Sequence, residues 1–326
     1  MFPQRFHRRK FLKIIGFSMI GSIGYGSYSL LNKKVEKASW NGTVLNTPAK
    51  IEIHSLNAKK NKKILSEVDM LVEKYDSIFN LQNVASEINK LNSTKKLLNP
   101  SSELLDVVQK SLLLSDITNG SFDITVQPLW DFYYAHYIIE QNKNPPNKRN
   151  LNNIVDLVNW KNVILNDNSI ELINNASITL NGIAQGWITD EITALLKSYD
   201  IENTLVDFGE NYVLGLYENS RPWNILLQGP ENITKVLSLS NSAIATSGGY
   251  GTIFEPSATY HHIFDAKTGL SANNFRAVSV LSDKAWLSDG ISTSALSMKK
   301  KQLLNVSKRF NSTVYIVEKQ KFELLI

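Results

Sequence analysis

The spacing of hydrophobic positions along the chain alternates between the period of a strand and that of a helix. Ala49–His54 alternates apolar and polar residues, which predicts a strand. Lys62–Phe79 and Ser102–Asp116 place apolar residues three and four apart, which predicts two helices with one buried face each. Asn99-Pro100-Ser101 in front of the second is a typical helix start. The first third of the chain therefore reads as a strand followed by helices.

The rest of the chain mixes short apolar runs with helical stripes. Gln141–Asn150 is polar, contains two prolines and predicts a surface loop. Short strands are predicted at Val163–Leu165, Ile170–Ile173, Ile178–Leu180, Thr204–Val206, Val213–Leu216, Asn224–Leu227, Ala277–Leu281 and Thr313–Val317. Helices are predicted at Ile188–Tyr199, Leu287–Met298 and Lys301–Phe310. The pattern favours an α+β fold, and the length leaves room for one large domain or two smaller ones.

Composition and charge narrow the function classes. With 43% hydrophobic and 20% charged residues, the 326-residue chain is typical of a globular protein. It has no cysteine, which excludes disulfides, thiolate metal sites and a cysteine nucleophile. Residues 1–37 hold eight Lys or Arg and one Glu, a net of +7, so the remainder carries −2 of the total of +5. No basic helix with interleaved aromatics accompanies this charge, so we expect no nucleic-acid partner.

The basic segment itself has the layout of an export signal. His7–Lys13 contains paired arginines, and Ile14–Leu31 is an apolar run diluted by Gly and Ser. Residues 1–38 resemble a twin-arginine signal, which predicts a periplasmic protein or one at the outer face of the bacterial cytoplasmic membrane. A short membrane anchor or a basic amphipathic arm is the alternative. Since no clear cleavage site precedes Trp40, retention as an anchor stays open, and membrane contact is expected only through this segment.

Asp289 and Thr293 are candidates for a metal site. They lie four residues apart in a predicted helix, so their carboxylate and hydroxyl oxygens project from the same face. Two such hard donors suit Mg²⁺ or Ca²⁺. The alternative is a solvated or capping pair.

A histidine and two small-residue loops are further candidates. His261 and His262 stand beside a turn, where a histidine serves as acid, base or phosphate donor, or simply as a structural residue. Asn181–Gly186 lies between an apolar run and a helix, so its backbone allows close approach of a phosphate. Thr246–Gly251 has a similar composition. Both loops are equally compatible with structural turns.

Taken in order, these segments resemble the FAD:protein FMN transferase (ApbE) family from about Trp40 to the C-terminus. The matching segments are Ser86–Asn92, Thr118–Trp130, Leu180–Gly186 with Asp190, Val206–Glu210, Ala245–Gly248, His262–Asp265 with Thr268–Gly269, and Asp289 with Thr293. Leu-Asn-Gly-Ile-Ala-Gln-Gly at 180–186 is similar to exported members associated with nitrous oxide respiration.

The resemblance implies a single mixed α/β domain of the flavin-transferase type over residues 39–326. It also implies FAD as substrate together with Mg²⁺. Such an enzyme moves FMN from FAD onto a threonine of a target flavoprotein as a phosphoester and releases AMP. The acceptor would be exported or membrane-bound, and a respiratory membrane flavoprotein is our expectation. Two alternatives stay open: a non-catalytic FAD-binding assembly or carrier protein, and a pyrophosphatase that converts FAD to FMN and AMP.

The resemblance also implies roles for individual residues. Asp289, Thr293 and a backbone carbonyl of the loop containing Gly182 would bind the metal. His262 would lie beside the transferred group and either assist proton transfer or steady the phosphate. Contacts to FAD are implied for Ser121, Phe122, Asp123, Thr179, Gln185 and Ile263. Gln185 stands where a lysine or glutamate is common, and Gln82 where an aromatic residue often covers the adenine, so these departures bear on FAD affinity.

Overall fold

A computed structural model describes residues 36–55 and 58–326, and the predicted signal at 1–38 falls largely outside them. Within these residues, eight antiparallel strands form the central sheet in the order β1-β2-β6-β7-β10-β11-β12-β13. The strands are β1 (Glu36–Val44), β2 (Thr47–Ser55), β6 (Thr204–Asp207), β7 (Asn211–Leu214), β10 (Ser242–Ser247), β11 (Ala277–Ser282), β12 (Thr313–Val317) and β13 (Phe322–Leu324). The division of the chain at residue 38 stays a prediction.

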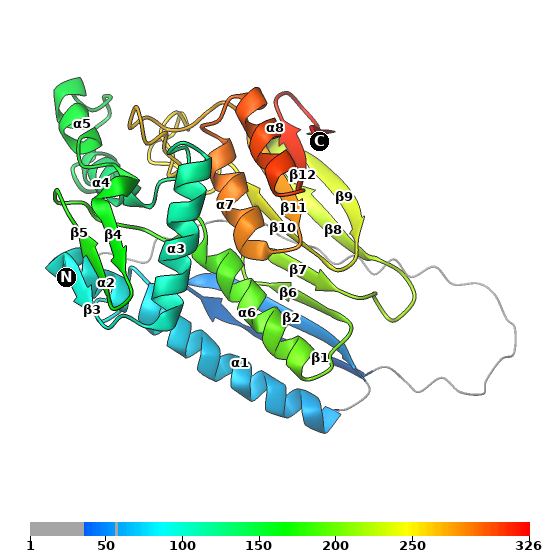
Figure 1. Cartoon of the computed structure of the whole chain (residues 1–326). Helices are drawn as coiled ribbons and strands as arrows, with labels where there is room; N and C mark the ends of the chain where they lie inside the picture. Colours follow the sequence, from blue (N-terminus) through cyan, green and yellow to red (C-terminus); the bar gives the residue numbers. More distant parts are fainter. Residues whose placement is uncertain (1–35, 56–57) are drawn as a thin grey trace, which may run out of the picture.

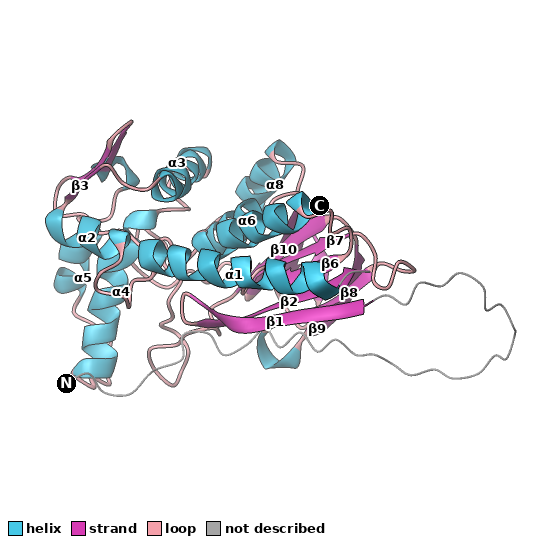
Figure 2. Ribbon diagram, turned by 90° about the horizontal axis from the view of Figure 1, so that it is seen from below, coloured by secondary structure: helices cyan, strands magenta, loops and turns pink. Residues whose placement is uncertain are grey.

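One face of the sheet is covered by a layer of helices (Figures 1 and 2). This layer contains α1 (Ala58–Phe79), α6 (Ala184–Ser198), α7 (Ala285–Ala295) and α8 (Lys300–Arg309), with α3 (Ser102–Ile117) alongside. Apolar residues of the strands, such as Ile51 and Val206, are buried beneath these helices in the main core. The helical stripes found in the sequence therefore face this core, as their spacing predicts.

The opposite face of the sheet packs against a two-stranded hairpin. Its strands are β8 (Trp223–Gln228) and β9 (Thr234–Leu239). Leu205 of β6 lies in this second core with Trp223 and Ile225, although its neighbour Val206 lies in the main core. Such alternation is the side-chain period of a strand with both faces buried.

A third group of elements lies at one end of the sheet (Figure 1). It contains α2 (Glu87–Thr94), β3 (Lys96–Leu98), α4 (Gln127–Tyr134), the π-helix Ala135–Ile139, α5 (Lys148–Val155), β4 (Val163–Asn166) and β5 (Ser169–Leu172). Short 3₁₀ turns at Ile124–Val126 and Trp160–Asn162 join these elements, and another lies at Pro230–Asn232. Tyr133 of α4 is fully buried among aromatic side chains.

The structure confirms the α+β fold and corrects several predicted elements. Ile178–Leu180 is not a strand, because the side chain of Asn92 bonds both the N–H and the C=O of Ile178, at 2.7 and 2.8 Å. The predicted loop Gln141–Asn150 is too long, since Asn147 caps a helix that begins at Lys148. The small-residue loop predicted at Thr246–Gly251 begins inside β10. Among residues 36–55 and 58–326, no helix has the length and hydropathy needed to cross a membrane.

Candidate active site

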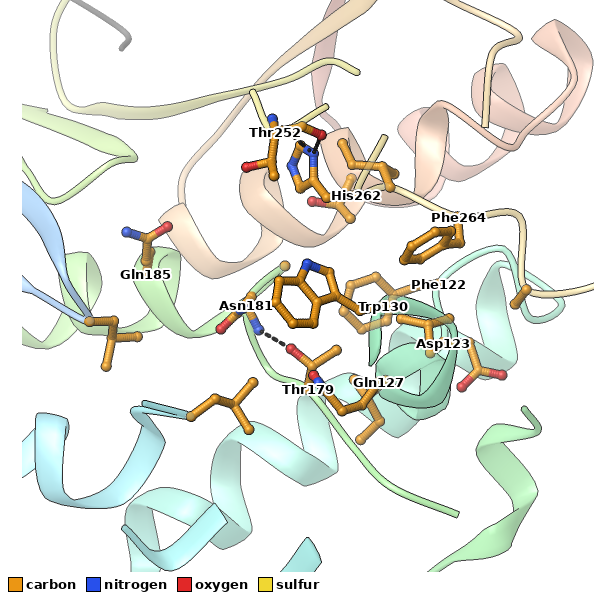
Figure 3. Close-up of a pocket in the computed structure, with 18 of the residues that line it drawn as sticks. Phe122, Asp123, Gln127, Trp130, Thr179, Asn181, Gln185, Thr252, His262 and Phe264 are labelled. Carbon is orange, nitrogen blue, oxygen red and sulfur yellow. Dashed lines mark hydrogen bonds between the residues drawn. The ribbon is translucent and has the colours of Figure 1, made fainter. Parts of the chain in front are cut away.

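An open pocket lies where the helical layer meets the third group of elements (Figure 3). Together with the open solvent at its mouth, the empty space amounts to about 1170 Å³. Every residue predicted to bind FAD lines it, together with Gly182, His262 and Thr293. Asp289 alone among the predicted site residues is fully buried behind the lining.

The three predicted metal ligands come together on one side of the pocket. A Cβ placed on Gly182 would lie 3.0 Å from Thr293 Cγ2 and 3.3 Å from its Oγ1, so the loop backbone packs directly on Thr293. Asp289 lies one helical turn earlier on α7, and its Oδ2 accepts a hydrogen bond from Gly186 N at 3.2 Å. We call Gly182, Asp289 and Thr293 the oxygen wall.

Two carboxylates fix the helices that carry this wall. Asp190 of α6 accepts hydrogen bonds from the first amides of α7, Ala285 N at 2.9 Å and Trp286 N at 3.0 Å. Asp289 of α7 in turn accepts from Gly186, in the first turn of α6. Each helix thus supplies a carboxylate to the N-terminus of the other, where the helix dipole is positive. Burial raises the pKa of Asp190, while its hydrogen bonds to Ala285 and Trp286 act to lower it.

Gly186 is the residue that lets α6 and α7 approach so closely. A Cβ there would lie 2.4 Å from Ala285 O and 2.8 Å from Asp289 Cβ, which no side chain tolerates. Glycine is therefore required by contact between helices rather than by an unusual backbone angle.

The oxygen wall suits a hard divalent cation. No three His, Asp or Glu side chains of the described chain gather as metal ligands, so a cation here would rely on one carboxylate with a hydroxyl and a backbone carbonyl. These are the donor types that Mg²⁺ accepts, and its reluctance to shed water favours sites completed by substrate phosphates. A single buried carboxylate leaves net positive charge on such a cation for an anionic ligand.

The two adjacent histidines have different environments. Backbone atoms of Thr252 lie 3.1 and 3.2 Å from Nδ1 of His262, so the other ring nitrogen, Nε2, points away from Thr252 (Figure 3). In His261, Nδ1 accepts from Ile263 N at 3.3 Å, so Nε2 bears the hydrogen and donates to Asn273 Oδ1 at 2.9 Å. Burial lowers the pKa of His261. Only His262 lines the pocket.

Three rings, Phe122, Trp130 and Phe264, also line the pocket, and we call them the aromatic wall (Figure 3). Trp130 stacks on Tyr134 with ring centroids 4.8 Å apart and 14° between planes. Phe264 stacks on Tyr133 at 5.4 Å and 14°. These second rings hold the aromatic wall from behind, leaving ring faces available to a flat ligand.

The remaining predicted FAD residues border the two walls. Asp123 lines the pocket, but its carboxylate also accepts bonds from Thr125 N and Oγ1 and from Trp160 N, so it shapes this loop. Burial raises its pKa against these hydrogen bonds. Gln185 lies against Gly209, whose φ of +93° and lack of a side chain leave room for its amide.

Several lining residues were not predicted. Leu45, Asn46 and Thr47 reach the pocket from the β1–β2 turn, in which both Leu45 and Asn46 have positive φ. Leucine is a poor marker of such a turn, so composition gave no signal. Asn181 and Trp130 lay inside recognised motifs, the loop at 180–186 and the segment Thr118–Trp130, but neither was singled out as a lining residue.

Comparisons with known proteins place this site in context. The model of the ApbE family matches residues 45–316. The FAD:protein FMN transferase of Vibrio cholerae serotype O1 is 27% identical over 302 residues, covering 88% of this chain and 89% of the relative. That of Haemophilus influenzae is 23% identical, covering 79% of each chain.

Solved structures agree with the fold. The flavin transferase ApbE from Vibrio cholerae superposes with a TM-score of 0.76 at 25% identity, covering 89% of this chain and 97% of that one. An ApbE protein from Thermotoga maritima gives 0.78 at 22% identity, covering 89% and 97%. The second likeness concerns the fold alone.

Proposed function

The chain belongs to the ApbE family, and on this premise we propose that it is a Mg²⁺-dependent FAD:protein FMN transferase. One observation carries the proposal from the structure: the same pocket is lined by the oxygen donors of Gly182 and Thr293, by the stacked ring of Trp130, and by His262. FAD has the matching parts, an anionic pyrophosphate and flat ring systems.

The reaction exchanges the phosphoanhydride bond of FAD for a phosphoester to threonine. The hydroxyl oxygen of an acceptor threonine attacks the phosphorus on the FMN side of the pyrophosphate. The bond from that phosphorus to the oxygen bridging to AMP breaks, and AMP leaves with the electron pair. The hydroxyl proton is lost during the exchange, so the overall change is threonine plus FAD to FMN-threonine plus AMP.

The oxygen wall would hold Mg²⁺ through Asp289, Thr293 and the Gly182 carbonyl. When bound, Mg²⁺ neutralises charge on the pyrophosphate and stabilises charge on the departing phosphate. Gly186 and Asp190 act before any ligand arrives, because the helix contacts described above place Asp289 and Thr293 one turn apart on a fixed helix. Preorganisation of this kind avoids reorganisation during the reaction.

His262 would serve the transferred group through Nε2. Its Nδ1 is held at the backbone of Thr252, which sets the plane of the ring. In the tautomer whose Nδ1–H donates to Thr252 O, Nε2 carries the lone pair that can accept the threonine proton. The aromatic wall would pack against a ring of FAD and so orient the pyrophosphate toward the oxygen wall.

We also propose the compartment and the partner. Residues 1–38 would direct export by the twin-arginine route, which fits an acceptor in the periplasm or at the outer face of the cytoplasmic membrane. The acceptor would be a flavoprotein with an accessible threonine, and a respiratory membrane flavoprotein that serves nitrous oxide respiration is the partner we favour. The sequence of the 180–186 loop supports this choice.

The test incubates the purified chain with FAD, Mg²⁺ and a threonine-containing acceptor domain. We expect the acceptor to gain the mass of FMN, to fluoresce in a gel, and to release an equal amount of AMP, all prevented by a chelator. AMP without an adduct, across several acceptor domains, would instead identify a pyrophosphatase. Bound FAD with neither product would identify a carrier. Replacing the acceptor threonine with valine is the matched control.

A further inference from the structure

A row of buried hydroxyls connects the end of β10 to the oxygen wall. Thr293 Oγ1 lies 3.3 Å from Ser247 Oγ, and Ser247 Oγ lies 2.9 Å from Ser292 Oγ. Ser292 Oγ lies 3.0 Å from the backbone carbonyl of Asp289. Ser292 is fully buried and Ser247 is 6% exposed, so bulk water offers them few alternative partners.

Counting hydrogens gives this row a direction. A carbonyl oxygen can only accept a hydrogen bond, so Ser292 donates its single hydroxyl hydrogen to Asp289 O. Between Ser247 and Ser292, the hydrogen must therefore come from Ser247. The single hydroxyl hydrogen of Ser247 is then already donated to Ser292. Thr293 is therefore the donor in its hydrogen bond with Ser247. Every hydroxyl hydrogen in the row points away from the pocket, toward the Asp289 carbonyl.

We propose that Ser247 is a positioning residue that orients the hydroxyl of Thr293, so that its lone pairs rather than its hydrogen face the bound cation. The inference rests on the proposed function, because it assumes that Thr293 is a metal ligand. A hydroxyl that rotated freely would present its hydrogen to the cation in part of its orientations. Fixing the tautomer or rotamer of a metal ligand through a second residue is a general way to strengthen a site.

The chain contains a matched control for this hydroxyl row. Thr246 Oγ1 and Ser279 Oγ lie 2.7 Å apart on neighbouring strands β10 and β11. Ser279 is fully buried, as Ser292 is, but its hydroxyl partner is Thr246 rather than a residue of the oxygen wall. Removing the Ser279 hydroxyl therefore deletes a comparable hydrogen bond without disturbing the row.

The test measures binding of Mn²⁺, a spin probe for the Mg²⁺ site, to the full chain saturated with FAD. Free Mn²⁺ is read from its electron paramagnetic resonance signal, so the readout needs no turnover. We expect Ser247→Ala to weaken Mn²⁺ binding about tenfold, Ser247→Thr to bind as wild type, and Ser279→Ala to bind as wild type. Equal binding by wild type and Ser247→Ala would overturn the proposal.

A double-mutant cycle separates orientation from general packing. Ser292→Ala alone removes the acceptor of the Ser247 hydrogen, which then competes for Thr293, so we expect weaker Mn²⁺ binding. In a Ser247→Ala background the row is already broken, and Ser292→Ala should add nothing. Independent, additive losses of Mn²⁺ affinity would contradict the proposal that the hydroxyl row orients Thr293. Thermal unfolding checks that each variant is folded, and Ser292→Ala keeps the test valid if Ser247→Ala is unstable.

Asp289→Asn distinguishes this inference from the proposed function. If Asp289→Asn abolishes Mn²⁺ binding while Ser247→Ala leaves it intact, the metal site is supported and the role of Ser247 is wrong. If wild type binds no Mn²⁺, or Asp289→Asn binds Mn²⁺ as well as wild type, both the assignment of the metal site and the role of Ser247 are wrong.

Discussion

The oxygen wall and the aromatic wall face the same pocket but are held in place by different forces. Asp289 is fully buried, and Asp190, which supports it, has a pKa raised by burial. Such groups cost free energy to bury and are stabilised by hydrogen bonds from helix ends. Trp130 and Phe264 instead stack on further rings, and their burial favours folding.

The difference indicates that the oxygen wall lowers the stability of the fold for the sake of function, whereas the aromatic wall does not. A neutral isostere in the oxygen wall removes a buried charge, so it should lose activity while leaving the fold intact or more stable. A truncation in the aromatic wall removes packing and ligand contact together. The following substitutions test this contrast.

The largest effect is expected for Asp289→Asn. The amide oxygen can still accept from Gly186 N, but the charge that would hold Mg²⁺ is lost. We expect FMN transfer to slow about a thousandfold, which is about 4 kcal/mol in the barrier. Acceptor mass against time gives the rate, and thermal unfolding should show a melting temperature no lower than that of wild type. A rate within a few-fold of wild type would remove Asp289 from the metal site.

His262→Gln should have the next largest effect. Glutamine retains hydrogen bonding but accepts a proton poorly, so we expect transfer about a hundredfold slower with FAD affinity unchanged. Single-turnover rates and flavin fluorescence titration separate the two quantities. His261→Gln is the matched control, since His261 bonds Asn273 away from the pocket, and its loss should lower stability rather than rate. A defect of His262→Gln confined to FAD binding would make His262 a contact residue.

Asp207→Asn sharpens the claim that buried acids on this side are costly. Asp207 precedes the turn that packs on Gln185, and burial raises its pKa from 3.8 to about 6. Because the folded pKa exceeds the unfolded one, ionisation lowers stability as pH rises from about 4 to 6.

The asparagine variant should therefore match wild type below about pH 4 and be more stable by about 3 kcal/mol above pH 7. Urea unfolding across this pH range measures the difference, and its slope m checks that the unfolded state is unchanged. A difference that does not vary with pH would contradict a buried, ionised Asp207.

Trp130→Ala is expected to give the smallest effect. Loss of the ring face should weaken FAD binding about fivefold to tenfold, or about 1 kcal/mol, and leave the rate at saturating FAD near that of wild type. Fluorescence titration of FAD measures this change. Trp286→Ala is the control, because Trp286 does not line the pocket. Unchanged affinity in Trp130→Ala would show that the aromatic wall does not contact FAD.

The sequence predicted the elements whose side chains follow a clear period. Lys62–Phe79 and Ser102–Asp116 became α1 and α3 because their apolar residues face the main core. β10 was missed because its small and hydroxyl residues do not alternate, and its end serves the site through Ser247. Ile178 was wrongly predicted as part of a strand. Its backbone hydrogen bonds are made with the side chain of Asn92 instead of a neighbouring strand, and no local sequence pattern reveals such a partner.

The candidate site was predictable where chemistry follows local spacing. Asp289 and Thr293 share a helix face at four residues' separation, and Gly182 belongs to a recognisable loop. Hydrogen bonds between distant parts of the chain were not predictable. The bonds from Asp190 to α7 and from Ser247 to Thr293 join segments far apart in sequence, and only their tertiary placement brings them together.

In the proposed complex, the oxygen wall and the aromatic wall bind different parts of the same FAD molecule. Crystals of the chain grown with FAD and Mn²⁺, measured at a wavelength where manganese scatters anomalously, would show both contacts. We predict an anomalous peak bordered by Gly182, Asp289 and Thr293, with the pyrophosphate beside it and a ring of FAD on Trp130. A peak elsewhere, or FAD bound with its phosphates against the aromatic wall, would contradict the account.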